Sequence, residues 1–430
     1  MTVSSKLALL GGEPVVPLGT SRPRWPLIHE EDVEAVTKHL RCHELSAYEV
    51  LDGPIFEFEK ELTSYFGARY ALLVANGTSA LYSAISALRL RPEEEVVVPA
   101  CTFPATGAPV LHLGATVRLA DVDPETGNPT LEHLRSAINE RTRAVMVAHA
   151  WGLPADMPSI VPFLRNSGIP LIEDAARAFG TRCGGQEMGS FGLAGCFSLH
   201  ELKAVPGGEG GLLITSDRTV YERSVALGHY YRCKEALHLS QPDLLVFRDS
   251  GLGLNLQIHP LAAALARSQF RRSPQRLEIL SRNRECLKSA SAGLPGLTIQ
   301  EVPMWAERVS HYGFNFHWRP DGLVSAPSRS TVVQALQAEG IGASGPGNPS
   351  LHQLPLFRQP GTANLPGRVA GTLEDHVFPG SVEHHRTLLR LPVLYEPDSQ
   401  WLCYYRNALE KVTCSLADLH RWERTVGSPR

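Results

Sequence analysis

Short apolar segments alternate with helical patterns through the first half of this chain. Seven such segments lie at 70–75, 95–99, 116–120, 142–149, 170–174, 195–199 and 211–215. Helical stretches separate most of them, at 55–66, 76–88, 101–113, 131–138 and 157–167. Repeated βα units with nearly continuous apolar strands are typical of a mainly parallel sheet that is covered on both faces. The sequence therefore predicts an α/β fold with a mostly parallel central sheet.

The pattern changes after a long amphipathic stretch at about 261–290. Beyond it we expect strands at 297–301 and 313–318, helices at 328–339, 382–389 and 399–412, and an irregular segment at 342–380. With 430 residues the chain is long enough for two or three domains. We predict an irregular N-terminal segment (1–25), a large α/β domain (26–265) and a smaller C-terminal α+β domain (266–430).

Lys203 stands between Ser198, five residues before it, and the glycine-rich run Gly207-Gly-Glu-Gly-Gly211. A run of small residues that leads into a strand holds a tight loop. A lysine on such a loop is suited to reaching a carbonyl group and forming a Schiff base. Most lysines, however, are solvated surface groups, so this stretch alone leaves both interpretations open.

The strand at 70–75 runs directly into Asn76-Gly-Thr-Ser-Ala and a helix. Free backbone N–H groups and the positive end of the helix dipole make such a turn a ready anion site, to which Thr78 and Ser79 can add hydroxyl groups. The alternative is a capped helix start, because Ser and Thr are favoured there in any case.

Asp174 ends the buried strand at 170–174, and Phe103 follows the strand at 95–99. Asp174 either caps the next helix or pairs with a ligand nitrogen and keeps it protonated. Phe103 either belongs to the core or stacks on a flat ring. Ligands of parallel α/β sheets bind beyond the carboxyl ends of the strands. Since Asp174, the turn at 76–80 and the loop 198–203 all lie at such ends, we expect one common site.

Composition excludes several classes of function. The net charge is −3, with no basic stripe, so nucleic acids and anionic membranes are poor candidates for partners. No apolar run approaches the roughly 20 residues that span a bilayer, and the first residues do not resemble a secretion signal. Eight scattered cysteines without a C-x-x-C pair indicate reduced thiols and a cytoplasmic protein. His39 and His43 are four residues apart, but no accompanying motif supports a zinc site, so we expect no metal centre.

Several short motifs occur in a familiar order and spacing. They are Gly53-Pro with Phe58-Glu59, Asn76-Gly-Thr-Ser-Ala-Leu81, Val98-Pro-Ala-Cys-Thr-Phe103, Asp121-Val-Asp123, Val147-Ala-His149, Ile172-Glu-Asp174-Ala-Ala, Phe197-Ser198 with Lys203, Gly208-Glu-Gly-Gly211 and Gly253-x-Asn255. With them the chain resembles, nearly end to end, the DegT/DnrJ/EryC1/StrS aminotransferases. These are pyridoxal-phosphate (PLP) enzymes of fold type I that act on keto-sugars and cyclitols.

This resemblance implies a role for each matching residue. Lys203 would form the Schiff base with PLP and shuttle the proton, and Asp174 would pair with the pyridine nitrogen so that the ring acts as an electron sink. Phe103 would stack on the ring. Three hydroxyl residues would hold the phosphate: Thr78, Ser79 and Ser198. Asn255 would reach the phosphate of the neighbouring subunit, which implies a homodimer with composite active sites.

Arg177 departs from the family pattern, which usually has Gln three residues after the aspartate, in contact with the 3′ oxygen of the cofactor. Arg is always charged. It would stabilise the phenolate and lower the pKa of the imine, or else bind a substrate carboxylate. His200, before the lysine, either touches substrate or packs.

The leading hypothesis is an aminotransferase that passes an amine from glutamate or glutamine to a keto-sugar, cyclitol or related ketone in secondary-metabolite assembly. The alternative, motivated by Arg177, is a PLP-dependent dehydratase or aromatase, epimerase or carbon–carbon bond-forming enzyme. A non-catalytic relative is disfavoured because Lys203 is present. We expect four loops to set the substrate: 42–53, 181–190, 229–250 and 342–380.

Overall fold

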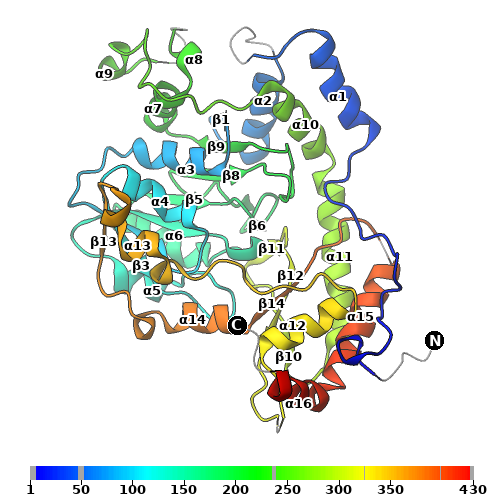
Figure 1. The fold of residues 1–430 in the computed structure, drawn as a ribbon. Helices are drawn as coiled ribbons and strands as arrows, with labels where there is room; N and C mark the ends of the chain where they lie inside the picture. Colours follow the sequence, from blue (N-terminus) through cyan, green and yellow to red (C-terminus); the bar gives the residue numbers. More distant parts are fainter. Residues whose placement is uncertain (1–5, 47–52, 235–238, 324, 398, 427–430) are drawn as a thin grey trace.

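The computed structural model describes residues 6–46, 53–234, 239–323, 325–397 and 399–426. Part of the predicted specificity loops, at 47–52 and 235–238, lies outside these residues. An eight-stranded sheet occupies the centre of the molecule, and a smaller C-terminal region is joined to it by the long α10–α11 connection (Figure 1). The predicted α/β class is confirmed.

The central sheet has the strand order β1-β9-β8-β5-β4-β2-β3-β13. Every neighbouring pair is parallel except those of β9, which runs against β1 and β8. The strands, in sheet order, are β1 (Tyr70–Val74), β9 (Gly211–Thr215), β8 (Ala194–Ser198), β5 (Leu171–Asp174), β4 (Thr142–Ala148), β2 (Glu95–Pro99), β3 (Thr116–Ala120) and β13 (Arg368–Ala370).

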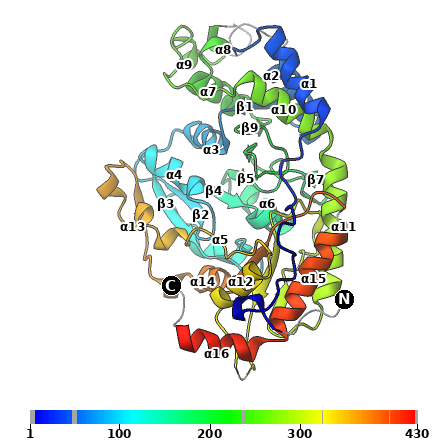
Figure 2. The ribbon, with the colours of Figure 1, turned by 45° about the vertical axis from the view of Figure 1, so that its right-hand side comes forward.

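Helices cover both faces of this sheet (Figure 2). They are α2 (Pro54–Phe66), α3 (Gly77–Ser86), α4 (Pro104–His112), α5 (Leu131–Ala137), α6 (Met157–Asn166), α7 (Arg218–Gly228) and α10 (Pro260–Arg271). Three further helices flank them: α1 (Glu30–Arg41), α8 (Tyr230–Lys234) and α9 (Pro242–Leu245).

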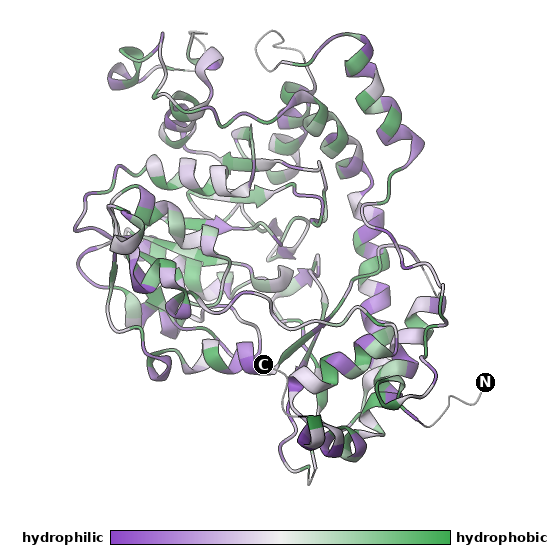
Figure 3. Ribbon diagram, in the orientation of Figure 1, coloured by the Kyte–Doolittle hydropathy of each residue, from purple (hydrophilic) through white to green (hydrophobic). Residues whose placement is uncertain are grey.

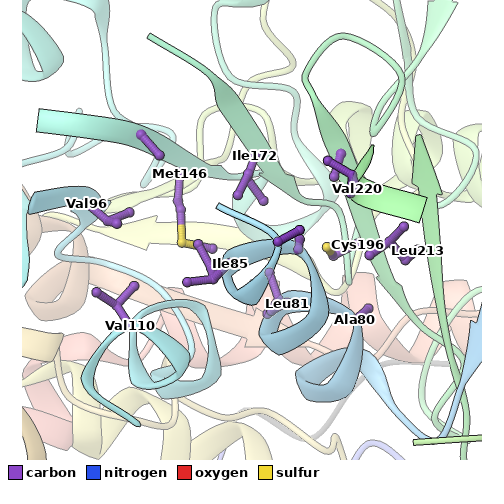
Figure 4. Close-up of a cluster of buried hydrophobic side chains, with 14 of the residues drawn as sticks. Ala80, Leu81, Ile85, Val96, Val110, Met146, Ile172, Cys196, Leu213 and Val220 are labelled. Atoms are coloured by element: carbon purple, nitrogen blue, oxygen red, sulfur yellow. The ribbon is translucent and has the colours of Figure 1, made fainter. Parts of the chain in front are cut away.

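The two faces of the sheet carry separate apolar cores, because successive strand residues point to opposite sides. Leu72 and Val74 pack with α3, α4 and α7, whereas Leu73 packs with α2 and α10. Figure 4 shows the first core, where Leu81 and Ile85 of α3 lie against Met146 and Ile172 of the sheet. The strands are correspondingly green in Figure 3.

The C-terminal region is built on a three-stranded antiparallel sheet, β10 (Leu297–Ile299), β12 (Phe314–Trp318) and β14 (Leu388–Leu391). A second small sheet joins β11 (Ala306–Arg308) to the hairpin β6 (Arg182–Cys183) and β7 (Gln186–Glu187). The helices of this region are α11 (Ser273–Ser291), α12 (Arg329–Ala338), α13 (Pro355–Arg358), α14 (Pro379–Thr387), α15 (Ser399–Thr413) and α16 (Leu416–Val426).

The structure corrects five sequence-based expectations. The long helix breaks at Arg272, because Pro274 in the first turn of α11 cannot continue the hydrogen-bond ladder of α10. The predicted loop 229–250 contains α8 and α9, and the segment 342–380 contains α13 and β13. Residues 388–391 form β14 instead of ending a helix, since pairing with β12 overrides the local pattern. Helix α16 was not predicted.

The N-terminal segment, predicted to be irregular, contains only a single 3-10 turn at Ala8–Leu10 within its described residues. It packs on the C-terminal region, where the Glu339 carboxylate accepts hydrogen bonds from the amides of Ala8 and Val15 at 2.8 and 2.9 Å. Lys411 pairs with the same carboxylate at 2.8 Å. The division of the chain at residue 265 stays a prediction.

Candidate active site

A cavity of about 350 Å³ opens at the carboxyl ends of the parallel strands β1, β2, β4, β5 and β8. The C-terminal region closes one side, with Tyr312, Pro346, Asn348, Pro349, Ser350 and His385. Six of the predicted site residues line this cavity: Thr78, Phe103, Asp174, Arg177, Ser198 and Lys203. The parallel sheet therefore gathers residues from segments more than 100 positions apart.

One end of the cavity is the N-terminus of α3. Asn76 caps the helix, since its side-chain oxygen accepts the Ser79 amide at 2.8 Å and the Ser79 hydroxyl at 3.0 Å. Gly77 allows the helix to approach β8, because a Cβ there would lie 3.0 Å from Cβ of Ser198. Thr78 and Ser198 line the cavity at this point, whereas Ser79 is buried behind it. The first amides of the helix and two hydroxyls form a cradle for an anion.

Asp174 ends β5 and is 7% exposed. Its carboxylate accepts a 2.6 Å hydrogen bond from the Thr106 hydroxyl and a 3.1 Å bond from the Ala176 amide. Thr106 belongs to the first turn of α4, so that helix orients the acid. The carboxylate is thus held in place at the cavity wall and can pair with a positively charged ligand nitrogen.

Glu173, the residue before Asp174, fixes the end of β5 through buried hydrogen bonds. Glu173 accepts three backbone amides at 2.7, 2.7 and 2.8 Å, from Gly189, Phe191 and Gly192. It also accepts the His149 ring Nε2–H at 3.1 Å, because Nδ1 of that ring receives the Ala155 amide. The ends of β4 and β5 are therefore fixed to each other, which sets the position of Asp174.

Lys203 lies on the loop between β8 and β9. Gly207 permits this loop to pack on α10, where a Cβ would lie 2.9 Å from the Ala262 carbonyl oxygen, and Gly208 has φ +83°. The Lys203 ammonium lies 4.5 Å from the centre of the Tyr312 ring. Burial, followed by the charge of Arg177, lowers the pKa of Lys203 from 10.5 to about 8. Lowered basicity leaves part of the amine neutral near neutral pH, as a nucleophilic lysine requires.

Arg177 lies between two aromatic rings. Its guanidinium carbon is 4.5 Å from the Trp151 ring centre and 4.9 Å from that of Tyr312. Ser310 fixes the same turn by donating a 2.9 Å hydrogen bond to the Arg177 carbonyl. Burial lowers the pKa of Arg177 below its usual value, but a guanidinium group stays charged.

Trp151, Tyr312 and Arg390 were not predicted as site residues. Trp151 follows β4 with φ +58°, and its indole N–H donates to Nε2 of His384 at 2.9 Å. The Tyr312 amide donates to the Trp151 carbonyl at 2.8 Å. An aromatic residue just after a strand end was the signal for Trp151. Tyr312 and Arg390 gave none, because they come from the C-terminal region and reach the site only through tertiary packing.

Two predicted residues face outward. Phe103 lines the cavity mouth with 52% of its surface exposed. Asn255 is exposed and does not line the cavity of its own subunit. His200 lines the cavity near Glu209, at 3.7 Å.

The described residues contain no group of three or more metal-ligating side chains that could hold a metal ion. No helix among them is long and apolar enough to cross a bilayer.

Comparisons with known proteins agree on one family. The DegT/DnrJ/EryC1/StrS aminotransferase family profile matches residues 26–376. The chain is 32% identical over 287 residues to UDP-N-acetyl-3-dehydro-alpha-D-glucosamine 3-aminotransferase of Acidithiobacillus ferrooxidans, which covers 66% of this chain and 72% of that protein. It is 29% identical over 321 residues to 3-amino-5-hydroxybenzoate synthase of Amycolatopsis mediterranei, covering 75% and 80%.

The fold is also that of a solved relative. The crystal structure of DesI in the presence of its TDP-sugar product superposes with a TM-score of 0.80 at 25% identity, and the match covers 98% of this chain and 99% of that one. The likeness in fold therefore extends over nearly the whole chain, including the central sheet and the loop that carries Lys203.

Proposed function

Because the chain belongs to the DegT/DnrJ/EryC1/StrS aminotransferase family, we propose that it moves an amino group from glutamate or glutamine to a keto-sugar, cyclitol or related ketone in secondary-metabolite assembly. Members of this family are PLP-dependent aminotransferases, and PLP is the cofactor of this enzyme. The proposal concerns the two substrates and the residues that act on them.

The cavity fits this cofactor. The cradle at the N-terminus of α3, with Thr78 and Ser198, would hold the phosphate, and Ser79 would support it from behind. Asp174 would hold the ring nitrogen in its protonated form, and Phe103 would cover a ring face. Bound PLP supplies an electron sink that stabilises negative charge on the carbon bearing the amine.

Lys203 would carry the cofactor and then act as the base. Its amine has a pKa of about 8, so a neutral fraction is present near pH 7.5 to accept a proton from the substrate carbon. Arg177 would lie at the 3′ oxygen of the cofactor and stabilise negative charge there. The residues of the C-terminal region that line the cavity, Tyr312 among them, form its C-terminal wall. This wall would exclude water from the reacting face.

A single observation carries this proposal: Lys203, Asp174 and an anion cradle converge on one cavity. The purified protein should be yellow, and glutamate or glutamine should bleach the colour. Adding a suitable ketone should then restore it. Lys203→Ala should remove the yellow colour without unfolding the chain. A wild-type protein that no amino acid bleaches would contradict the proposal.

Arg177 also favours a second candidate, a PLP-dependent dehydratase or aromatase, an epimerase or a carbon–carbon bond-forming enzyme. A fixed cation beside the cofactor stabilises developing negative charge during elimination as well as during transamination. One relative is itself a synthase of an aromatic amine. Steady turnover of one substrate with no amino donor consumed would favour this candidate over transamination.

We also propose a homodimer with composite active sites. Five large apolar side chains between the end of α9 and residue 254 are exposed: Leu245, Val246, Phe247, Leu252 and Leu254. Exposed apolar side chains gathered in one segment are what an interface would cover. Asn255 follows these residues in the chain and does not line the cavity of its own subunit, as expected of a residue that serves the partner's cofactor.

We also propose a cytoplasmic location, because all eight cysteines are free thiols, as expected in a reducing compartment.

A further inference from the structure

Two guanidinium groups share the Trp151–Tyr312 pair. Arg177 lies 4.5 Å from the Trp151 ring centre and 4.9 Å from that of Tyr312, and Arg390 lies 4.6 and 5.4 Å from the same rings. The Lys203 ammonium is 4.5 Å from the Tyr312 ring. Three cations therefore surround one tyrosine.

The register of β14 places Arg390 on the strand face that points toward Trp151 and Tyr312. Leu389 and Leu391 point into the core of the C-terminal region, where both are at most 1% exposed. Leu388 lies on the opposite face and packs on Ala150 and Trp151. Because strand residues alternate, Arg390 shares the face of Leu388. The Arg390 amide and carbonyl are paired with Ser344, at 2.8 and 2.9 Å, so the backbone is fixed.

Neither arginine forms an ion pair within the part of the chain that the structure describes. Arg390 donates from Nη2 to the Tyr312 carbonyl at 3.1 Å, and its buried Nε has no hydrogen-bond partner among the described residues. Asp174 acts electrostatically on Arg177 without forming an ion pair with it, and its carboxylate accepts hydrogen bonds from Thr106 and Ala176 instead.

A structural arginine of this same chain looks different. Arg232 is also buried, and both of its terminal nitrogens bind the Glu59 carboxylate, at 3.0 and 3.1 Å. A buried cation without such a partner is costly. Arg177 lines the cavity, and Arg390 contacts the same two rings of its wall. These two guanidinium groups without an ion pair are therefore arranged for an anion that the described part of the protein does not supply.

We propose that Arg177 and Arg390 form a subsite for the carboxylate of a small-molecule substrate, beside Lys203 and across the Trp151–Tyr312 pair. This inference rests on the proposed function, since the cavity must also hold the cofactor. A guanidinium group has five N–H donors, so Arg177 would serve the 3′ oxygen of the cofactor and the carboxylate with different N–H groups. The phosphate cradle is a different part of the cavity lining, formed by the N-terminus of α3 with Thr78 and Ser198. A planar carboxylate matches the guanidinium fork and accepts two hydrogen bonds from it.

The carboxylate has two possible sources, the amino donor or the amino acceptor, and one set of variants distinguishes them. The variants are Arg177→Gln, Arg390→Gln and Arg390→Lys. Arg386→Gln is the matched control, because Arg386 lies four residues from Arg390, is 55% exposed and pairs only with Glu383 among the described residues. Retained yellow colour and an unchanged circular dichroism spectrum establish that each variant holds the cofactor and folds.

Two measurements use the holoenzyme. Bleaching by glutamine and by glutamate gives the apparent affinity for the donor. Calorimetric titration with 4-oxocyclohexanecarboxylate, compared with the uncharged 4-oxocyclohexanecarboxamide, gives the affinity for a carboxylate on a cyclic ketone. Loss of a charge-assisted hydrogen bond should weaken binding by about ten- to a hundredfold. Arg390→Lys, which keeps the charge but not the fork, should lie between wild type and Arg390→Gln.

Weaker donor binding in both Gln variants supports the subsite with the donor as its source. Weaker binding of the ring carboxylate, with the carboxamide unchanged, supports the acceptor as its source. Changes within twofold for donor and carboxylate alike overturn the subsite. A wild-type enzyme that no amino acid bleaches overturns the aminotransferase proposal instead, and in that case the calorimetric comparison alone decides the subsite.

Discussion

The indole nitrogen of Trp151 donates a 2.9 Å hydrogen bond to Nε2 of His384, 233 residues later in the chain. The other ring nitrogen of His384 donates to the Pro124 carbonyl at 2.9 Å, so this histidine is neutral with a fixed tautomer. Burial lowers its pKa to about 3. The bond joins the end of β4 to α14 and holds the aromatic wall of the cavity in place.

Trp151→Phe should cost about 1–2 kcal/mol of unfolding free energy, because the buried His384 nitrogen loses its donor. An aromatic ring is retained beside both arginines, so carboxylate binding should change little. Trp151→Leu should weaken carboxylate binding as well, since it removes the aromatic face. Urea unfolding and ligand titration measure the two effects. A phenylalanine variant as stable as wild type would show that the bond contributes nothing.

Arg177→Gln should raise the pKa of Lys203 above its value of about 8. Burial, the larger cause of the depression, stays, but the nearby positive charge is removed. Only the neutral amine attacks a carbonyl, so the pH midpoint for rebinding PLP to the apoenzyme should move upward. Arg386→Gln should leave the midpoint unchanged. A midpoint that stays at the wild-type value would mean that Arg177 does not act on the lysine.

The lowered pKa of Lys203 also makes the stability of the apoenzyme depend on pH. Between pH 8 and 10.5 the unfolded chain holds the Lys203 proton and the folded apoenzyme releases it, so this group makes stability increase with pH in that window. Lys203→Met should lack this increase. Thermal unfolding of the apoenzyme across the window, compared with wild type, measures the difference.

Thr106→Val should destabilise the protein by about 1.5–3 kcal/mol, because the buried Asp174 carboxylate loses a 2.6 Å hydrogen bond. Thr106→Ser keeps the hydroxyl and should stay close to wild type. Chemical denaturation of the three proteins tests this. A Val variant as stable as wild type would show that the hydroxyl bond to Asp174 contributes nothing to stability.

Gly77→Ala should weaken PLP binding by roughly tenfold, since the added methyl group pushes α3 away from Ser198 and opens the cradle. Gly361→Ala is the control, because a Cβ there meets nothing within 4 Å. Equilibrium dialysis of the apoenzymes with PLP gives both affinities. If the Gly77→Ala variant binds PLP with wild-type affinity, the N-terminus of α3 does not hold the phosphate of the cofactor.

Composite sites predict rescue between two inactive proteins. In a mixed dimer of Lys203→Ala and Asn255→Ala subunits, one site receives both defects and the other receives neither. Random reassociation should therefore restore about a quarter of the wild-type activity. No recovery, with mixed dimers verified by mass spectrometry, would mean that each subunit completes its own site.

Local pattern was sufficient for much of the α/β half and its site. The apolar runs correspond to strands of the central sheet, and Asp174 and Lys203 lie at the strand ends where the alternation places them. In this half each βα unit is a local structure, so its period and its turn residues are visible within a short window.

The C-terminal wall was not predictable in the same way. Arg390 resembles any charged residue in a short apolar run, and only the pairing of β14 with β12 turns it toward Trp151. No local signal pointed to the role of His384, which accepts a hydrogen bond from a residue far away in sequence. These contacts depend on tertiary packing, which overrides local preference.

The strand β13 places a piece of the C-terminal half on the outer edge of the central sheet, beside β3. The chain thus crosses between the two parts of the molecule more than once, first through α10 and α11 and again through residues 342–378 (Figure 1). Each crossing ties the C-terminal region to the central sheet at a separate place, so we expect Tyr312 and Arg390 to be held together as parts of one wall.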